Sequence, residues 1–123
     1  MSRHEDAVRR YFAAWNATGD AGELEKAVGE AFAEDATYTD PLGVASGREQ
    51  IVAAIRGAHA QFPGFTFRPT GTPDAHHDVV RFTWDLVSSG DGSAPVAGFD
   101  VVTLAEDGRV RTVTGFLDRV PGA

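Results

Sequence analysis

The chain has 123 residues, of which 42% are hydrophobic and 24% are charged, which is typical of one globular domain and not of a disordered or fibrous chain. Its formal charge is −7, from 11 basic and 18 acidic residues, which argues against binding to nucleic acid or to an anionic membrane surface. There is no cysteine, so disulfides, thiolate metal sites and cysteine nucleophiles are excluded. We expect residues 1–123 to form a single domain.

The start of the chain carries charged residues, and no long apolar run follows them. We therefore expect neither a secretory signal peptide nor a membrane-spanning segment. The default expectation from these two features is a soluble cytoplasmic protein.

Apolar residues at helical spacing predict two helices in the first quarter of the chain. The first helix places Ala7, Tyr11 and Trp15 on one face and ends at the glycine-containing segment 18–22. The second helix has an apolar face that runs from Leu24 to Phe32. The sequence therefore predicts a pair of amphipathic helices at the start of the fold.

A short strand and a third helix follow. The strand is predicted at residues 36–39, and Asp40 ends it because the residue before a proline avoids helical geometry. Ser46 and Glu49 have the spacing of a capping box, which predicts the start of the third helix at that point. Pro63 and the glycine after it end this helix.

The hydrophobic period changes to two from residue 65 onward. This alternation predicts strands near residues 65–70, 80–87, 98–104 and 110–118, with turns at 88–93 and 106–108. The polar segment 73–78 is interpreted as a further turn. Helices followed by a run of antiparallel strands indicate an α+β fold with the helices on one face of the sheet. The many aromatic residues fit either a packed core or the wall of a cavity.

Three polar residues stand in contexts that favour chemistry. Tyr11 lies on the apolar face of the first helix, and Asp40 closes the first strand. Asp100 shares a strand face with Val102 and Leu104, where burying its charge is costly. Each residue also has a structural interpretation: a core tyrosine, a turn-forming aspartate, and an aspartate that faces solvent if the opposite strand face is buried.

Two segments of the chain resemble the bacterial ketosteroid isomerases and the broader SnoaL-like or NTF2-like family. They are VRRYFAAWNA at residues 8–17 and FAEDATYTDPLG at residues 32–43, and the position of Asp100 ahead of the turn at residues 107–108 is also similar. The resemblance implies an NTF2-like α+β cone, in which a curved antiparallel sheet wraps around the N-terminal helices and encloses one pocket.

The resemblance also implies roles for the three polar residues. Asp40 would be the general base, Tyr11 would donate a hydrogen bond to the developing oxyanion, and a protonated Asp100 would be the second donor, as ketosteroid isomerases use a neutral aspartic acid. No cofactor is implied. The residues expected to line the substrate pocket are Trp15, Tyr38, Ile55, His59, Phe62, Phe82, Trp84 and Phe116.

The expected activity is therefore cofactor-free proton transfer, as an isomerisation or cyclisation of a small apolar carbonyl compound such as a steroid or polyketide. The alternatives are a non-catalytic binding domain and an epoxide hydrolase, for which Asn16 is the only asparagine available to orient a water. By resemblance we expect a homodimer formed through the outer sheet face. We expect no metal site, because His76 and His77 are adjacent and would point to opposite faces of an extended chain.

Overall fold

The computed structural model describes residues 2–121. Within them three helices and six strands follow in the order α1 (Arg3–Trp15), α2 (Ala21–Ala31), β1 (Phe32–Asp40), β2 (Gly43–Ser46), α3 (Gly47–Gln61), β3 (Phe65–His76), β4 (Val79–Ser88), β5 (Val96–Leu104) and β6 (Val110–Arg119). The α+β architecture predicted from the sequence is confirmed. No helix between residues 2 and 121 is long and apolar enough to cross a membrane.

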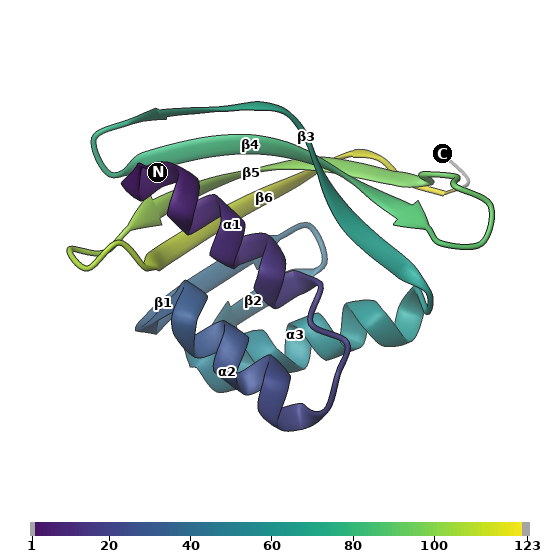
Figure 1. Cartoon of the computed structure of the whole chain (residues 1–123), viewed down its shortest axis with the longest axis horizontal. Helices are drawn as coiled ribbons and strands as arrows, with labels where there is room; N and C mark the ends of the chain where they lie inside the picture. Colours follow the sequence, from purple (N-terminus) through teal and green to yellow (C-terminus); the bar gives the residue numbers. More distant parts are fainter. Residues whose placement is uncertain (1, 122–123) are drawn as a thin grey trace.

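The six strands form one curved sheet in the order β2-β1-β6-β5-β4-β3. All neighbouring strands are antiparallel except β1 and β6, which pair in parallel, an arrangement that requires the long stretch of chain between them. The three helices lie on the inner side of this sheet (Figure 1). The arrangement is the predicted NTF2-like cone, with a mixed sheet in place of a wholly antiparallel one.

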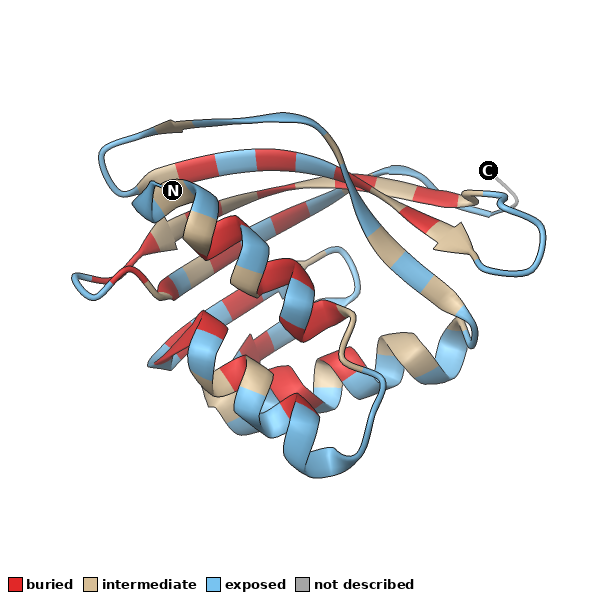
Figure 2. Ribbon diagram, in the orientation of Figure 1, coloured by how far each residue is buried: buried red, intermediate tan, exposed pale blue. Residues whose placement is uncertain are grey.

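The helices and the sheet bury one continuous core between them (Figure 2). In β5 every second residue is buried, which places Gly98, Asp100 and Val102 on the inner face of the sheet. Tyr11 and Trp15 on α1 face the same interior and are 2% and 7% exposed. The alternation of β5 therefore decides between the two interpretations of Asp100, and it points inward.

Several element boundaries differ from the prediction. The strand β2 was not predicted, because its four residues follow a Pro-Leu-Gly segment that resembles a turn. β1 begins at Phe32, which the periodicity assigned to the second helix. β3 continues through most of the predicted turn at residues 73–78, because it is an edge strand whose register shift between Thr70 and Asp74 accommodates Pro73.

The predicted capping box at Ser46 and Glu49 is absent. The Ser46 side chain forms no capping hydrogen bond, and Gly47 enters α3 with a φ of +83°, which changes how the chain approaches the helix. The Gln50 side chain accepts the Ser46 backbone N–H instead, at 2.8 Å. A capping box occurs at the start of α1, where Ser2 and Glu5 bond each other's backbone N–H groups.

Candidate functional site

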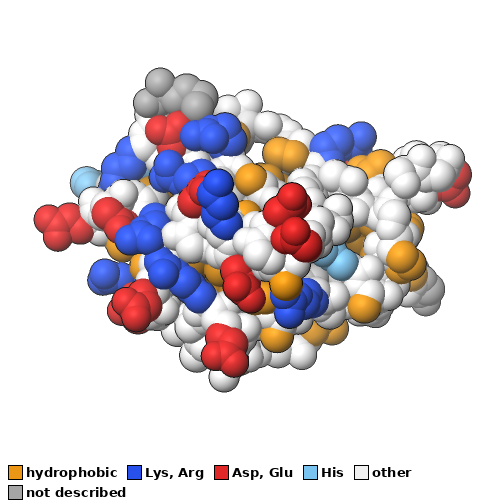
Figure 3. Space-filling model, turned by 60° about the horizontal axis from the view of Figure 1, so that its bottom comes forward, with side chains coloured by type: hydrophobic (Ala, Val, Ile, Leu, Met, Phe, Trp, Pro, Cys, Tyr) orange, Lys and Arg blue, Asp and Glu red, His pale blue; other side chains and the backbone are white. Residues whose placement is uncertain are grey.

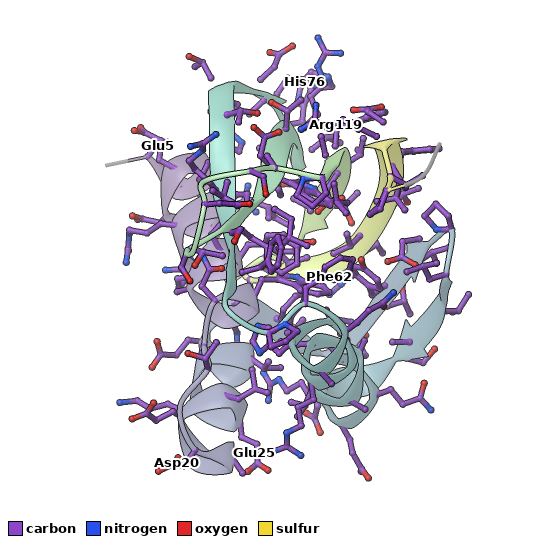
Figure 4. The ribbon with its side chains drawn as sticks, turned by 90° about the vertical axis from the view of Figure 1, so that its right-hand side faces the viewer. Glu5, Asp20, Glu25, Phe62, His76 and Arg119 are labelled. Carbon is purple, nitrogen blue, oxygen red and sulfur yellow. The ribbon has the colours of Figure 1, made fainter. Side chains whose placement is uncertain are left out.

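A cavity of about 920 Å³ lies between the inner face of the sheet and the helices α1 and α3. Figure 4 looks toward this region, with Phe62 near the centre of the view between the strands and α3. The cavity wall combines aromatic and aliphatic side chains with the carboxyl groups of Asp40 and Asp100. Among the described residues no lysine, arginine or histidine lines it. The space is therefore suited to an apolar compound, and the charged groups in its described lining are carboxyl groups.

The first polar pair in the cavity joins α1 to β5. The Tyr11 hydroxyl donates a hydrogen bond to Asp100 Oδ2 at 2.6 Å. Asp100 is 4% exposed, and it is the only charged side chain that is buried in the described part of the chain. The pKa of Asp100 is raised to about 6: burial is the main cause, the Tyr11 and Trp84 side chains oppose it, and the charge of Asp40 adds a smaller upward shift. Burial also raises the pKa of the Tyr11 hydroxyl well above its usual value, so this hydroxyl stays protonated.

The second polar pair lies on β1, close to the loop that follows it. The Tyr38 hydroxyl donates to Asp40 Oδ2 at 2.6 Å, and burial raises the pKa of this hydroxyl. Asp40 Oδ1 accepts the backbone N–H groups of Leu42 at 2.8 Å and Gly43 at 3.1 Å. The turn-forming interpretation of Asp40 is thus correct, and the same side chain also lines the cavity. Three donors already converge on its carboxylate.

Gly115 on β6 separates the two carboxyl groups. It pairs with Asp100 across the sheet. A Cβ atom on Gly115 would lie 2.8 Å from Asp100 Oδ1 and 3.4 Å from Asp40 Cβ. The two carboxylic acids therefore approach each other over a backbone position that has no side chain. Tyr11, Asp40 and Asp100, which are far apart in the sequence, are all brought to one cavity.

Five of the eight residues predicted to line the pocket do line it: Trp15, Tyr38, Phe62, Trp84 and Phe116. The other three do not. Ile55 and Phe82 point into the packed core and are 0% and 3% exposed. His59 Nε2 lies 2.6 Å from the Trp15 carbonyl oxygen, which gives this side chain a structural partner that ties α3 to α1. Ile55 and Phe82 lie on inward faces, as the periodicity indicates, but at depths where the core and not the cavity surrounds them.

Other contributors to the cavity were missed. Leu42 and Val44 are 79% and 71% exposed and stand at its edge with Phe116 and Val120, and these are the exposed large hydrophobic residues of the described chain. Figure 3 shows hydrophobic side chains gathered toward one end of the molecule, whereas acidic and basic side chains are interspersed over the rest of that face. The hydrogen bond between Tyr38 and Asp40 could have been predicted from the sequence, because residues two apart in a strand share one face.

The side chains proposed for other chemistries have different partners. Asn16 donates to the Phe67 carbonyl oxygen and accepts the Phe67 backbone N–H, both at 2.8 Å, so both ends of its amide fasten α1 to β3. No group of three or more potential metal ligands occurs among residues 2–121. In the turn between β3 and β4, the His77 carbonyl oxygen accepts a hydrogen bond from His4 Nε2 at 2.8 Å.

Comparison with known proteins identifies the family. The sequence model of the SnoaL-like domain matches residues 8–113, so the chain belongs to the SnoaL-like family. A proposed isomerase of this family from Agrobacterium tumefaciens is 42% identical, with a TM-score of 0.88 and coverage of 96% of this chain and 99% of that one. No curated protein matches.

More distant structures share the fold. A proposed polyketide cyclase from Sinorhizobium meliloti is 20% identical, with a TM-score of 0.70 and coverage of 94% of this chain and 99% of that one. A protein with a ketosteroid isomerase-like fold from Catenulispora acidiphila, solved with trimethylamine, is also 20% identical, with a TM-score of 0.68 and coverage of 89% and 82%. At this level of identity the similarity concerns the fold alone.

Proposed function

We propose that the protein is an enzyme that catalyses cofactor-free proton transfer, as an isomerisation or cyclisation, on a small apolar carbonyl compound such as a steroid or polyketide. The observation that carries this proposal is the buried Tyr11 to Asp100 hydrogen bond inside a cavity with mostly apolar walls. The 42% identity to a proposed isomerase of the same family supports it. The proposed polyketide cyclase is 20% identical, so its similarity supports the fold and not the activity.

The hydrogen bonds favour Asp100 as the proton acceptor, in place of the base role that the resemblance gives to Asp40. Both oxygens of Asp40 accept hydrogen bonds from neighbours, whereas Asp100 accepts one of normal geometry from residues 2–121, from Tyr11 at Oδ2. Asp100, with a pKa of about 6, is about tenfold more ionised than protonated at pH 7. A carboxylate with a raised pKa that is still ionised is a stronger base than an ordinary one.

The chemical step uses these groups as follows. Asp100 Oδ1 removes a proton from the carbon beside the substrate carbonyl. The carbon–hydrogen electron pair becomes the carbon–carbon double bond of an enolate, and the carbonyl π pair moves onto the oxygen. Tyr11 holds the carboxylate through Oδ2 while this occurs. Asp100, now neutral, returns the proton to a different carbon and completes the isomerisation. The apolar wall keeps water from the charged intermediate, which strengthens every electrostatic contact inside the cavity.

A direct test follows deuterium uptake from D₂O at the carbon beside the carbonyl in a panel of steroid and aromatic ketones, with nuclear magnetic resonance detection. Conversion of a β,γ-unsaturated ketosteroid to its conjugated isomer is followed in parallel by ultraviolet absorbance. We expect Asp100→Asn to lower the exchange rate at least about 100-fold. The matched control is Asp85→Asn, a surface acid that pairs with Arg68 and does not line the cavity.

One observation favours a second function, a non-catalytic binding domain. The Asp40 carboxylate is engaged by a turn and by Tyr38, as a structural aspartate would be. A binding domain would take up the same ketones without any deuterium exchange, and Asp100→Asn would leave their affinity unchanged. Exchange by the unmodified protein that is lost in Asp100→Asn excludes this function, and absence of exchange across the whole panel overturns the enzyme proposal.

A further inference from the structure

A tryptophan on β4 and a glycine on β5 lie face to face beside Asp100. Trp84 pairs with Gly98 across the two antiparallel strands. Gly98 and Asp100 are two residues apart in β5 and share its buried inner face. Trp84 also lines the cavity and is 8% exposed. The register of β4 and β5 therefore places the Trp84 indole next to the carboxyl group that we assign to proton transfer.

Gly98 allows the indole to lie against the strand. A Cβ atom at this position would be 2.6 Å from Trp84 Cζ2 and 3.0 Å from Trp84 Cε2, and it would also collide with the Phe116 carbonyl oxygen. No side chain other than hydrogen fits in this space without moving the indole or the neighbouring strand. Cε2 and Cζ2 belong to the same edge of the ring system as Nε1, so Gly98 leaves the space in which this edge of the indole lies.

The Trp84 Nε1–H group has no hydrogen-bond partner of normal geometry among the described residues, although it is buried. An unpaired buried donor is unfavourable, and such groups in native proteins are rare. The Trp84 side chain lowers the pKa of Asp100, which agrees with an Nε1–H group directed toward the carboxyl. The other titratable groups near Asp100 are Tyr11 on α1 and Asp40 and Tyr38 on β1.

We propose that Trp84 is a positioning residue for Asp100: its Nε1–H group donates to the Asp100 carboxylate when that group is ionised, and Gly98 makes this orientation of the indole possible. Tyr11 approaches the carboxylate from α1, so the carboxylate is held from the helix side and from the sheet side. The catalytic consequence rests on the function proposed above. The contact itself does not, because it is a property of the free protein.

The test uses the indole resonances in a ¹⁵N–¹H correlation spectrum of the whole chain. The chain contains only two tryptophans, so the spectrum has two indole signals, assigned by their loss in Trp84→Phe and in Trp15→Phe. We expect the Trp84 signal to shift downfield as pH rises from 4 to 8, with a midpoint near the pKa of Asp100, about 6. In Asp100→Asn the Trp84 signal should not titrate.

Trp15→Phe is the matched control, because Trp15 also lines the cavity and also carries a buried, unpaired Nε1–H group. Its indole lowers the pKa of Tyr11 and has no direct effect on that of Asp100. We expect Trp84→Phe to raise the midpoint of the Asp100 ¹³C carboxyl titration more than Trp15→Phe does. Equal midpoints in the unmodified chain and in Trp84→Phe, or a Trp84 signal that stays constant while Asp100 titrates, would overturn the proposal.

A kinetic measurement separates positioning from a structural role. With an exchanging ketone, Trp84→Phe should lower kcat about tenfold or more, because a misplaced carboxylate reacts slowly, whereas loss of the cavity wall alone would appear in KM. If the indole signal titrates and no ketone exchanges in any form of the protein, the contact stands and the proposed enzyme function fails. If exchange occurs and the indole signal is constant, the enzyme function stands and the role of Trp84 fails.

Discussion

Asp100 occupies a position where the strand otherwise buries aliphatic side chains, and two opposing effects set its charge. Burial and the nearby Asp40 carboxyl disfavour ionisation, whereas the Tyr11 hydroxyl and the Trp84 indole favour it. The result is a pKa near 6, so the carboxyl is ionised at neutral pH and still close to its point of titration. The Asp100 carboxylate is thus a negative charge held among aromatic side chains of the cavity wall.

Replacement of Asp100 by asparagine should not destabilise the protein at pH 7. The folded pKa of about 6 lies above the ordinary value of 3.8, so ionised Asp100 opposes folding by up to about 3 kcal/mol above pH 6. This penalty is absent below the ordinary pKa, grows as pH rises toward the folded pKa and is constant above it. Urea unfolding should therefore show an Asp100→Asn midpoint equal to or higher than that of the unmodified chain at pH 7.

The pH dependence gives this prediction a second readout. The difference between the two forms should shrink as pH falls from 7 to 4, because the unmodified chain gains stability when Asp100 takes up a proton. A midpoint for Asp100→Asn that is clearly lower at pH 7 would mean that the charge on Asp100 stabilises the fold, and our description of its environment would be incorrect.

The three polar residues of the site could be identified from the sequence, because each stands in an apolar or strand-ending context. Their hydrogen bonds could not. That Tyr11 donates to Asp100 depends on how α1 crosses the sheet, and that Asp40 is shared between a turn and the cavity depends on the loop before β2. The resemblance assigns the base role to Asp40, and it is these contacts that favour Asp100 for that role.

The helices and most strands follow from periodicity, since apolar spacing reports which face of an element is buried. The errors lie where local signals compete. β3 passes through a polar, proline-containing segment because an edge strand needs no hydrogen bond from the proline side. The pairing of β1 with β6 joins segments that are far apart in the sequence, and no local pattern indicates it. Because β6 lies between β1 and β5 in the sheet, Gly115 comes to lie between Asp40 and Asp100.

Substitution of Gly115 by alanine tests the importance of this position in β6. The added methyl group would meet Asp100 Oδ1 at 2.8 Å and displace it, since the opposite side is limited by Asp40. We expect a loss of stability of about 1–3 kcal/mol and at least about a tenfold lower kcat in ketone exchange. Denaturant unfolding and exchange kinetics measure the two effects.

Gly29→Ala in α2 is the matched control for Gly115→Ala. A Cβ atom at Gly29 meets nothing within 4 Å, and alanine is the better helix former. This change should stabilise the protein by about 0.5–1 kcal/mol and leave exchange kinetics unchanged. If Gly115→Ala behaves like Gly29→Ala, with full activity, the two carboxyl groups do not need the open backbone position.

The whole molecule has an outer sheet face with an aromatic stack. Phe99 on β5 points away from the Asp100 side, and its ring stacks on that of Phe116 with centroids 4.9 Å apart. Phe116 is 46% exposed. We expect this face to form a homodimer interface, because a half-buried Phe99 that stacks on an exposed Phe116 gives it an apolar aromatic surface, and such surfaces are typical of association sites.

Sedimentation velocity tests the assembly. The unmodified chain should sediment as a dimer at micromolar concentration, and Phe99→Glu should sediment as a monomer, because it places a charge in the interface. Lys26→Glu on the exposed side of α2 is the control and should remain dimeric. A monomer for the unmodified chain, or a dimer that Phe99→Glu does not change, would contradict this interface.

The pH dependence of kcat/KM for ketone exchange tests most directly whether Asp100 accepts the proton. If the ionised carboxylate is the base, kcat/KM should rise about tenfold per pH unit below its pKa, level off above about 6 and lose this dependence in Asp100→Asn. A rate that falls as pH rises above 6 would mean that neutral Asp100 is a hydrogen-bond donor, and the base role would return to Asp40.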